Sequence, residues 1–83
     1  MCARRSVYVI QSENSTGQYY SGLSADVTRR LAAHNSGESH HTRKYRPWRL
    51  LVAVEFALEE RAIRFERYLK SCSGRAFLKR HFQ

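Results

Sequence analysis

Residues 6–34, SVYVIQSENSTGQYYSGLSADVTRRLAAH, combine the patterns of two short strands, a turn and a helix. Residues 6–12 are rich in β-branched and aromatic side chains, which favours a strand. Because their apolar run occupies both faces, we expect this strand to be covered on both sides. Residues 13–18 have the composition of a turn. A second strand over residues 18–23 would complete a β-hairpin.

A helix is predicted after the second strand. Ser24 is a suitable N-cap, and Asp26 would lie in the first turn, where its negative charge interacts favourably with the helix dipole. The helix is expected to run to about Asn35, because residues 35–37 (Asn-Ser-Gly) are typical of a helix end.

The packing face of this helix carries two polar groups. Val27 and Leu31 form an apolar stripe at i and i+4, and Arg30 and His34 fall on the same side of the helix. Placing an arginine and a histidine toward the packing face indicates a specific role for them.

The remaining sequence predicts one more strand and two more helices. Residues 36–47 form a polar, basic loop, and residues 48–56 form a strongly apolar strand. A helix over residues 58–70 carries apolar side chains at i, i+4, i+7 and i+11. Residues 71–74 break this helix, and residues 75–82 form a short last helix. The apolar stripe of the helix over residues 58–70 consists of Leu58, Ala62, Phe65 and Leu69.

The predicted element order ββαβαα is that of an α+β fold, with helices packed against a three-stranded antiparallel sheet. The chain has 83 residues, which is enough for one small domain, residues 1–83. Fifteen Lys and Arg against seven Asp and Glu give a net charge of +8, which favours polyanions. Arginine, which binds phosphate in a bidentate fork, far outnumbers lysine, so nucleic acid is the favoured partner.

The two cysteines, Cys2 and Cys72, are far apart and cannot form a secretory disulfide framework. We therefore expect a reduced, cytoplasmic protein. The apolar run near the N-terminus, residues 7–10, is too short for a signal peptide or a membrane-spanning helix, so no membrane association is expected.

Two tyrosine-containing triplets precede the inward-facing arginine and histidine. They are residues 6–8 (Ser-Val-Tyr) and residues 20–22 (Tyr-Ser-Gly), and Arg30 and His34 follow. In this order and spacing, the residues resemble the GIY-YIG endonuclease family. The small stand-alone bacterial members of that family are similar over residues 35–37, 42–44, 46–48 and 62–71, and the resemblance covers roughly residues 7–78.

The resemblance implies a role for five residues. Tyr8 would be the general base that deprotonates a water, and Tyr20 would orient that water or bind phosphate. Arg30 would stabilise charge on the phosphate oxygens, and His34 would be a phosphate donor or proton shuttle. Glu66 would be the ligand of Mg²⁺ (or Mn²⁺), which suits a single carboxylate supplemented by waters.

Each of these residues also has an ordinary structural interpretation. Tyr8 would be a core tyrosine, Arg30 a solvated surface charge, and His34 a C-terminal cap of its helix. Glu66 would form an i, i+4 ion pair with Lys70.

Further residues are candidates for contacts with DNA. Tyr19 is the alternative to Tyr20 as the second motif tyrosine. Side chains alternate along a strand, so the two tyrosines point to opposite faces, and Tyr20 has the spacing to Gly22 that the motif requires. A zinc site built from His34, His40, His41 and Cys72 is disfavoured, because the spacing fits no common zinc motif. The predicted substrate-binding residues are Gly22, Arg29, Arg43, Lys44 and Arg46.

The resulting hypothesis is a metal-dependent DNA endonuclease that hydrolyses a phosphodiester and leaves a 5′-phosphate and a 3′-hydroxyl, with a role in DNA repair or recombination. The alternative is a catalytically weak or inactive nucleic-acid-binding module of the same fold. It is kept because the family's late asparagine is absent after Glu66. A purely structural protein is disfavoured by the charge. The expected partner is DNA, whether single-stranded, branched or duplex. Either a targeting protein supplies substrate selection, or this chain prefers single-stranded or branched DNA on its own; the family also allows a homodimer.

Overall fold

The computed structural model describes residues 5–15 and 17–82 and confirms the α+β fold. The prediction of one domain over residues 1–83 extends beyond that part of the chain and stays a prediction, as does everything expected of Cys2. The elements, in order, are β1 (Arg5–Ser12), β2 (Tyr19–Ser24), α1 (Val27–Ser36), β3 (Trp48–Phe56), α2 (Glu59–Leu69) and α3 (Cys72–His81).

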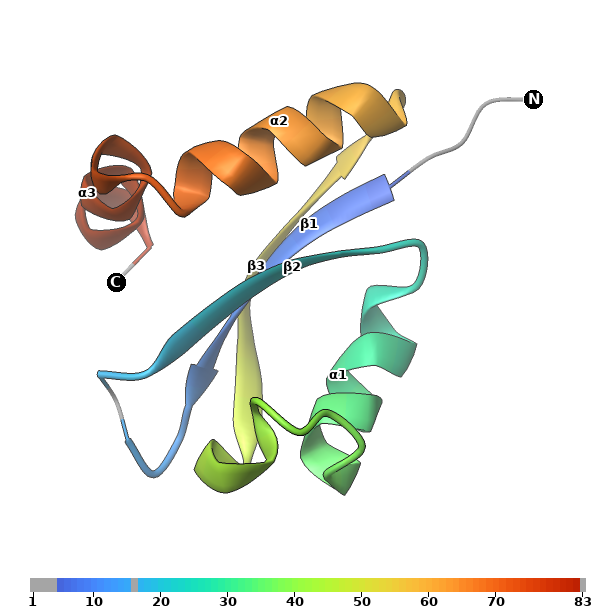
Figure 1. The fold of residues 1–83 in the computed structure, drawn as a ribbon, viewed down its shortest axis with the longest axis vertical. Coiled ribbons are helices and arrows are strands. Elements are labelled where there is room, and N and C mark those ends of the chain that lie inside the picture. Colours follow the sequence, from blue (N-terminus) through green and yellow to red (C-terminus); the bar gives the residue numbers. More distant parts are fainter. Residues whose placement is uncertain (1–4, 16, 83) are drawn as a thin grey trace.

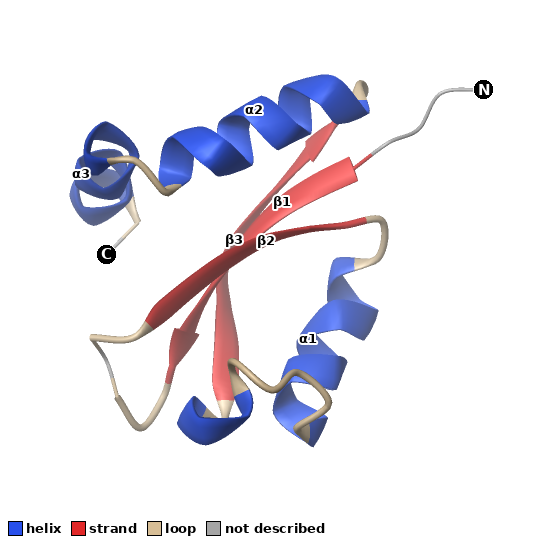
Figure 2. Cartoon of the chain, in the orientation of Figure 1, coloured by secondary structure: helices blue, strands red, loops and turns tan. Residues whose placement is uncertain are grey.

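Strand β1 is the centre of the sheet. The three antiparallel strands are ordered β2-β1-β3, with α2 and α3 on one side of the sheet and α1 on the other (Figures 1 and 2). Residues 7–12 of β1 are all buried, which confirms that this strand is covered on both faces. Its apolar run therefore reflects a position between two layers of helices.

Alternation along β1 divides the interior into two clusters. Odd-numbered residues face α2 and α3, and even-numbered residues face α1. The first cluster contains Val7, Val9, Ala62, Leu69 and Leu78. The second contains Tyr8, Ile10 and Trp48, with Tyr20, Val27, Leu31 and Tyr45 packed against them. Tyr8 thus lies on the α1 face, together with the apolar stripe predicted for α1.

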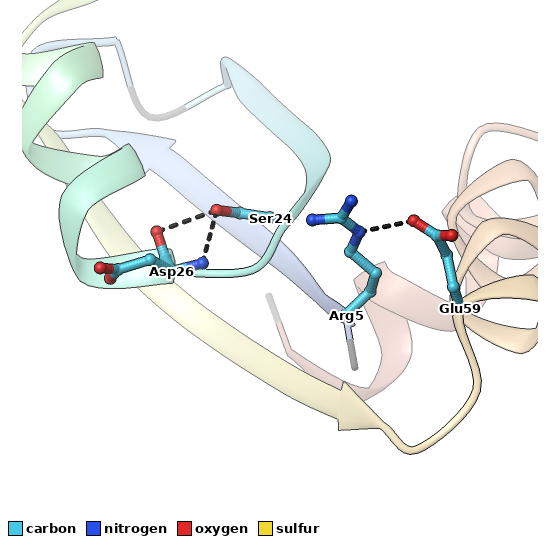
Figure 3. Close-up of polar contacts among 4 residues, drawn as sticks. All are labelled: Arg5, Ser24, Asp26 and Glu59. Atoms are coloured by element: carbon cyan, nitrogen blue, oxygen red, sulfur yellow. Dashed lines mark hydrogen bonds and ion pairs between the residues drawn. The ribbon is translucent and has the colours of Figure 1, made fainter. Parts of the chain in front are cut away.

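The start of α1 differs from the prediction. Asp26, rather than Ser24, is the N-cap, and its side chain accepts a hydrogen bond from the backbone N–H of Arg29. The Ser24 hydroxyl instead accepts from the backbone N–H of Asp26 and donates to its carbonyl (Figure 3). Ser24 and Asp26 are thus hydrogen-bonded to each other in the turn between β2 and α1. Because both residue types favour the N-cap position, the sequence alone does not indicate which of them caps α1.

The ends of α2 and α3 also differ. Leu58 was predicted in the core, but it is the N-cap of α2 and is 44% exposed. Helix α3 begins at Cys72 rather than at residue 75, because the Ser71 side chain caps it by accepting from the backbone N–H of Gly74. The predicted break at residues 71–74 is therefore only a tight corner. Part of the predicted basic loop, Arg43–Tyr45, forms a 3-10 turn.

Within residues 5–15 and 17–82, no helix is both long and apolar enough to span a bilayer. Cys72 is an exposed free thiol.

Gly74 is required by the corner between α2 and α3. An added Cβ would collide with the backbone carbonyl of Tyr68. A helical Gly→Ala change is ordinarily stabilising, but here we expect Gly74→Ala to lower the free energy of unfolding by about 1–3 kcal/mol. Urea unfolding measures this. The exposed neighbour, changed as Ser73→Ala, should stay within about 0.5 kcal/mol of the parent, and a stabilised Gly74→Ala protein would contradict the corner geometry.

Candidate active site

The phenol of Tyr8 lies beneath the neighbouring strand. Tyr8 is opposite Gly22 in the register of β1 and β2 and is 1% exposed. A Cβ built on Gly22 would lie 2.7 Å from the Tyr8 hydroxyl and 2.9 Å from the ring carbon that bears it. Gly22 was predicted to admit substrate, yet the space beside it holds the phenol. Its contact with DNA stays a prediction.

His34 joins Tyr8 to the loop after α1. The imidazole is fully buried, with Nε2 2.9 Å from the Tyr8 hydroxyl and Nδ1 2.6 Å from the Thr42 hydroxyl. Gly37, at φ 87°, is the C-cap of α1, so His34 does not take the capping role that was its alternative. The role of His34 as a phosphate donor or a proton shuttle stays a prediction.

The protonation state of His34 follows from its surroundings. Burial, with a smaller contribution from the charge of Arg30, lowers the pKa of His34 below its ordinary value. The imidazole is therefore neutral at pH 7 and has one N–H. If Nδ1 carries that proton and donates to Thr42, Nε2 accepts from Tyr8; in the other tautomer, Nε2 donates to Tyr8 and Nδ1 accepts from Thr42.

Tyr20 and Arg30 complete the polar group on the α1 face. The Tyr20 ring centroid is 6.3 Å from that of Tyr8 and 5.0 Å from that of His34. Hydrogen bonding to Tyr8, and more weakly to Tyr20, raises the pKa of Arg30 further, so the guanidinium is permanently charged. The structure therefore brings together four of the five predicted catalytic residues.

The acidity of Tyr8 is set by opposing effects. Burial raises the pKa of the phenol above its ordinary value, and the hydrogen bond and charge of Arg30 act in the opposite direction. The negative charge of Glu66 makes a smaller contribution that also raises this pKa. Deprotonation of Tyr8 at neutral pH therefore requires further positive charge.

Glu66 approaches from the other layer. It lies on α2, is 8% exposed, and its Oε2 is 2.6 Å from Nζ of Lys70. The ion pair that was its structural interpretation is thus present. Throughout residues 5–15 and 17–82, no three His, Cys, Asp or Glu side chains lie close enough together to bind a metal ion. A single carboxylate fits Mg²⁺, which retains several waters and takes one or two protein carboxylates.

The predicted DNA-contacting cations are exposed. Nη2 of Arg43 is 2.8 Å from Nδ1 of His40, and Nζ of Lys44 lies 5.5 Å from the centroid of the Tyr45 ring. Arg29 and Arg46 are also exposed, and Arg46 approaches Gly37. Their positions permit contact with a polyanion, and their role stays a prediction.

Thr42 was not predicted as part of the site. It is 2% exposed, and its carbonyl accepts a hydrogen bond of 2.8 Å from Nε1 of Trp48, which is itself buried. The backbone of Trp48 is in turn held by the side chain of Asn35. A threonine in a polar loop offers no periodicity, so no pattern in the sequence could indicate its burial.

This arrangement agrees with a family comparison. The family model described as the GIY-YIG catalytic domain matches residues 4–80. The chain belongs to the GIY-YIG family. The solution NMR structure of the UPF0213 protein BH0048 from Bacillus halodurans, at 31% identity, aligns with this GIY-YIG domain at a TM-score of 0.57. That alignment covers 94% of this chain and 84% of the other.

Relatives in sequence include a protein whose name states an activity. The structure-specific endonuclease subunit SLX1 of Scheffersomyces stipitis is 36% identical over 73 residues, covering 80% of this GIY-YIG chain and 22% of SLX1. A UPF0213 protein of Streptococcus pneumoniae is 42% identical over 65 residues, covering 77% of this chain and 64% of that protein. The chain thus spans less than two thirds of the length of both relatives.

Burial of neutral His34 makes stability depend on pH. The pKa of His34 is lowered in the folded protein, so the unfolded state binds the proton more readily below about pH 6.5. The contribution of neutral His34 to the free energy of unfolding is therefore fully present above that pH. It is lost as the pH falls toward the pKa of His34 in the folded protein. Urea midpoints from pH 5 to 8 should decline more steeply toward acid for the parent than for His34→Gln. Parallel profiles would contradict a depressed pKa.

Thr42 provides a second test of the same hydrogen bonds. Thr42→Val keeps the shape of the side chain but leaves Nδ1 of buried His34 without its partner, which should cost about 1–3 kcal/mol of unfolding free energy. Thr42→Ser retains the hydroxyl and should recover most of that loss. Chemical denaturation measures both variants, and equal stability of the valine and serine proteins would show that the hydroxyl is unimportant.

Proposed function

We propose that this GIY-YIG domain is a divalent-metal-dependent endonuclease that hydrolyses phosphodiester bonds in DNA. The observation that supports this best is the hydrogen-bonded series Tyr8–His34–Thr42, with the positive charge of Arg30 acting on the same phenol. A buried phenol that is hydrogen-bonded to an imidazole and interacts with a guanidinium is equipped for proton transfer next to an anion. The endonuclease name of the SLX1 relative supports the same reaction class.

Tyr8 is the proposed general base. In the tautomer with the proton on Nδ1, Nε2 of His34 accepts the Tyr8 proton, and Thr42 holds the imidazole in that orientation. As a water attacks phosphorus, its proton passes to the Tyr8 oxygen while the phenol proton passes to Nε2. This concerted route removes the need for a free phenolate, which the raised pKa of Tyr8 disfavours.

Arg30 and Tyr20 are proposed to act on the phosphate. The permanent charge of Arg30 offsets the negative charge that develops on the non-bridging oxygens. The Tyr20 ring, adjacent to both Tyr8 and His34, orients the attacking water or binds a phosphate oxygen.

Glu66 is the proposed ligand of Mg²⁺ or Mn²⁺. The bound ion would supply positive charge next to the scissile phosphate and help to stabilise the leaving oxygen. Glu66 presents a largely buried carboxylate whose charge already interacts with Tyr8. Lys70, which pairs with this carboxylate, competes with the cation for it.

The net charge of +8 supports DNA as the partner. We assign backbone contacts to the exposed side chains of Arg29, Arg43, Lys44 and Arg46, a cytoplasmic location to the protein, and a targeting protein or a second copy of the chain as a further partner. These assignments are proposals that rest on charge and exposure.

Cleavage of labelled DNA tests the assignment of Tyr8 and Glu66. Single-turnover rates on single-stranded, duplex and branched DNA should fall by about 10²–10⁴ in Tyr8→Phe, because the proton route is removed. Glu66→Gln should show a similar loss in Mg²⁺ or Mn²⁺, because the metal ligand is lost, while both variants still bind DNA.

The matched controls are Glu60→Gln, an exposed glutamate on the same helix, and Tyr68→Phe, an exposed tyrosine. Both should cut at the parental rate. A parent protein that binds every substrate and cuts none with either metal would refute the enzyme and favour the DNA-binding module. Cleavage that survives both Tyr8→Phe and Glu66→Gln would refute the assigned residues.

A further inference from the structure

A groove separates the start of β2 from α3, on the face of the sheet opposite Tyr8. It has a volume of about 690 Å³. Val9, Leu69 and Leu78 line its apolar part, and residues 17–21 form one wall. In Figure 1 this end of β2 lies on the same side of the view as α3, below it.

The rim of the groove is positively charged. Lys70, Arg75 and Lys79 line it, and each of them is exposed. None of the described residues that line the groove is acidic. Tyr19 contributes a half-buried ring, whose hydroxyl accepts a hydrogen bond of 2.9 Å from Nε2 of Gln11. An aromatic ring of fixed orientation, bordered by cations, is the composition of sites that bind unpaired bases and their phosphates.

The size of the groove favours an unpaired strand over a duplex. Its volume is in the range of small-molecule sites, about 300–1,000 Å³, which admits a nucleotide whose base is unstacked but not a stacked base pair. We infer that this groove binds a single-stranded segment of DNA, with Tyr19 stacking on a base and Lys79, Arg75 and Lys70 contacting phosphates.

The groove is connected to the proposed active site through Lys70. This lysine lines the groove and also pairs with Glu66 at 2.6 Å, and Tyr20 borders the groove as well. A strand in the groove would therefore continue directly to Glu66. In this respect the inference rests on the proposed function and deepens it, because it assigns DNA with an unpaired segment as the substrate class.

Binding without metal tests the groove separately from cleavage. Fluorescence anisotropy in EDTA would use a labelled single strand of about twelve nucleotides and the same strand annealed to its complement. Tyr19→Ala should weaken binding of the single strand at least about fivefold through loss of stacking. Lys79→Ala should weaken it and reduce the slope of log K against log salt by about 0.7. Duplex binding should change less than twofold in both variants.

Arg80→Ala is the matched control, because Arg80 is an exposed cation on the same helix that does not line the groove. Tyr19→Phe, which keeps the ring, should bind the single strand more tightly than Tyr19→Ala. Unfolding midpoints would verify that the variants are folded. Unchanged single-strand affinity in both groove variants, or an equal loss for single strand and duplex, would overturn the inference. If the predicted binding is seen in a protein that never cuts, the groove stands and the proposed nuclease activity fails.

Discussion

The close approach of Tyr8 to Gly22 is the constraint on which the rest of the site depends. A tyrosine in the middle of a central strand must bury its hydroxyl, and a buried hydroxyl requires partners. The neighbouring strand gives it space because residue 22 has no side chain. The imidazole of His34 provides a hydrogen bond, and the charge of Arg30 acts on the same phenol. Helix α1 thus places an inward polar side chain, His34, against that hydroxyl where it packs on the sheet.

The candidate site draws on both layers of the fold. Tyr8, Tyr20, Arg30 and His34 lie between the sheet and α1, whereas Glu66 comes from α2 on the other side. Strand β2 is one of the two edge strands of the sheet, and α2 contacts it. This short strand carries Tyr20, whose ring lies next to those of Tyr8 and His34, and Tyr19, which lines the cationic groove.

The spacing of apolar residues in the sequence predicted most of the fold. Strand β1 is buried on both faces and helices α1 and α2 on one face each, and both kinds of burial leave regular apolar patterns. This spacing placed Trp48–Phe56 at its observed limits and put Arg30 and His34 on the inner side of α1. Capping was harder to assign, because Ser24 and Asp26 form one hydrogen-bonded unit and Ser71 begins a helix where a break was expected. The burial of Thr42 was not predicted, because it depends on hydrogen bonds to His34 of α1 and Trp48 of β3, and both of these residues lie on other elements.

The contact between residues 8 and 22 has an evolutionary consequence. Because one position supplies the bulk that the other must lack, the two can change only in a restricted order. A larger residue at position 22 is excluded while the tyrosine remains, yet it becomes acceptable once position 8 has a smaller side chain. A lineage that abandoned the chemistry of the phenol would then be free to lose the glycine as well. Descendants of this fold that have changed their role should carry the two substitutions as a pair.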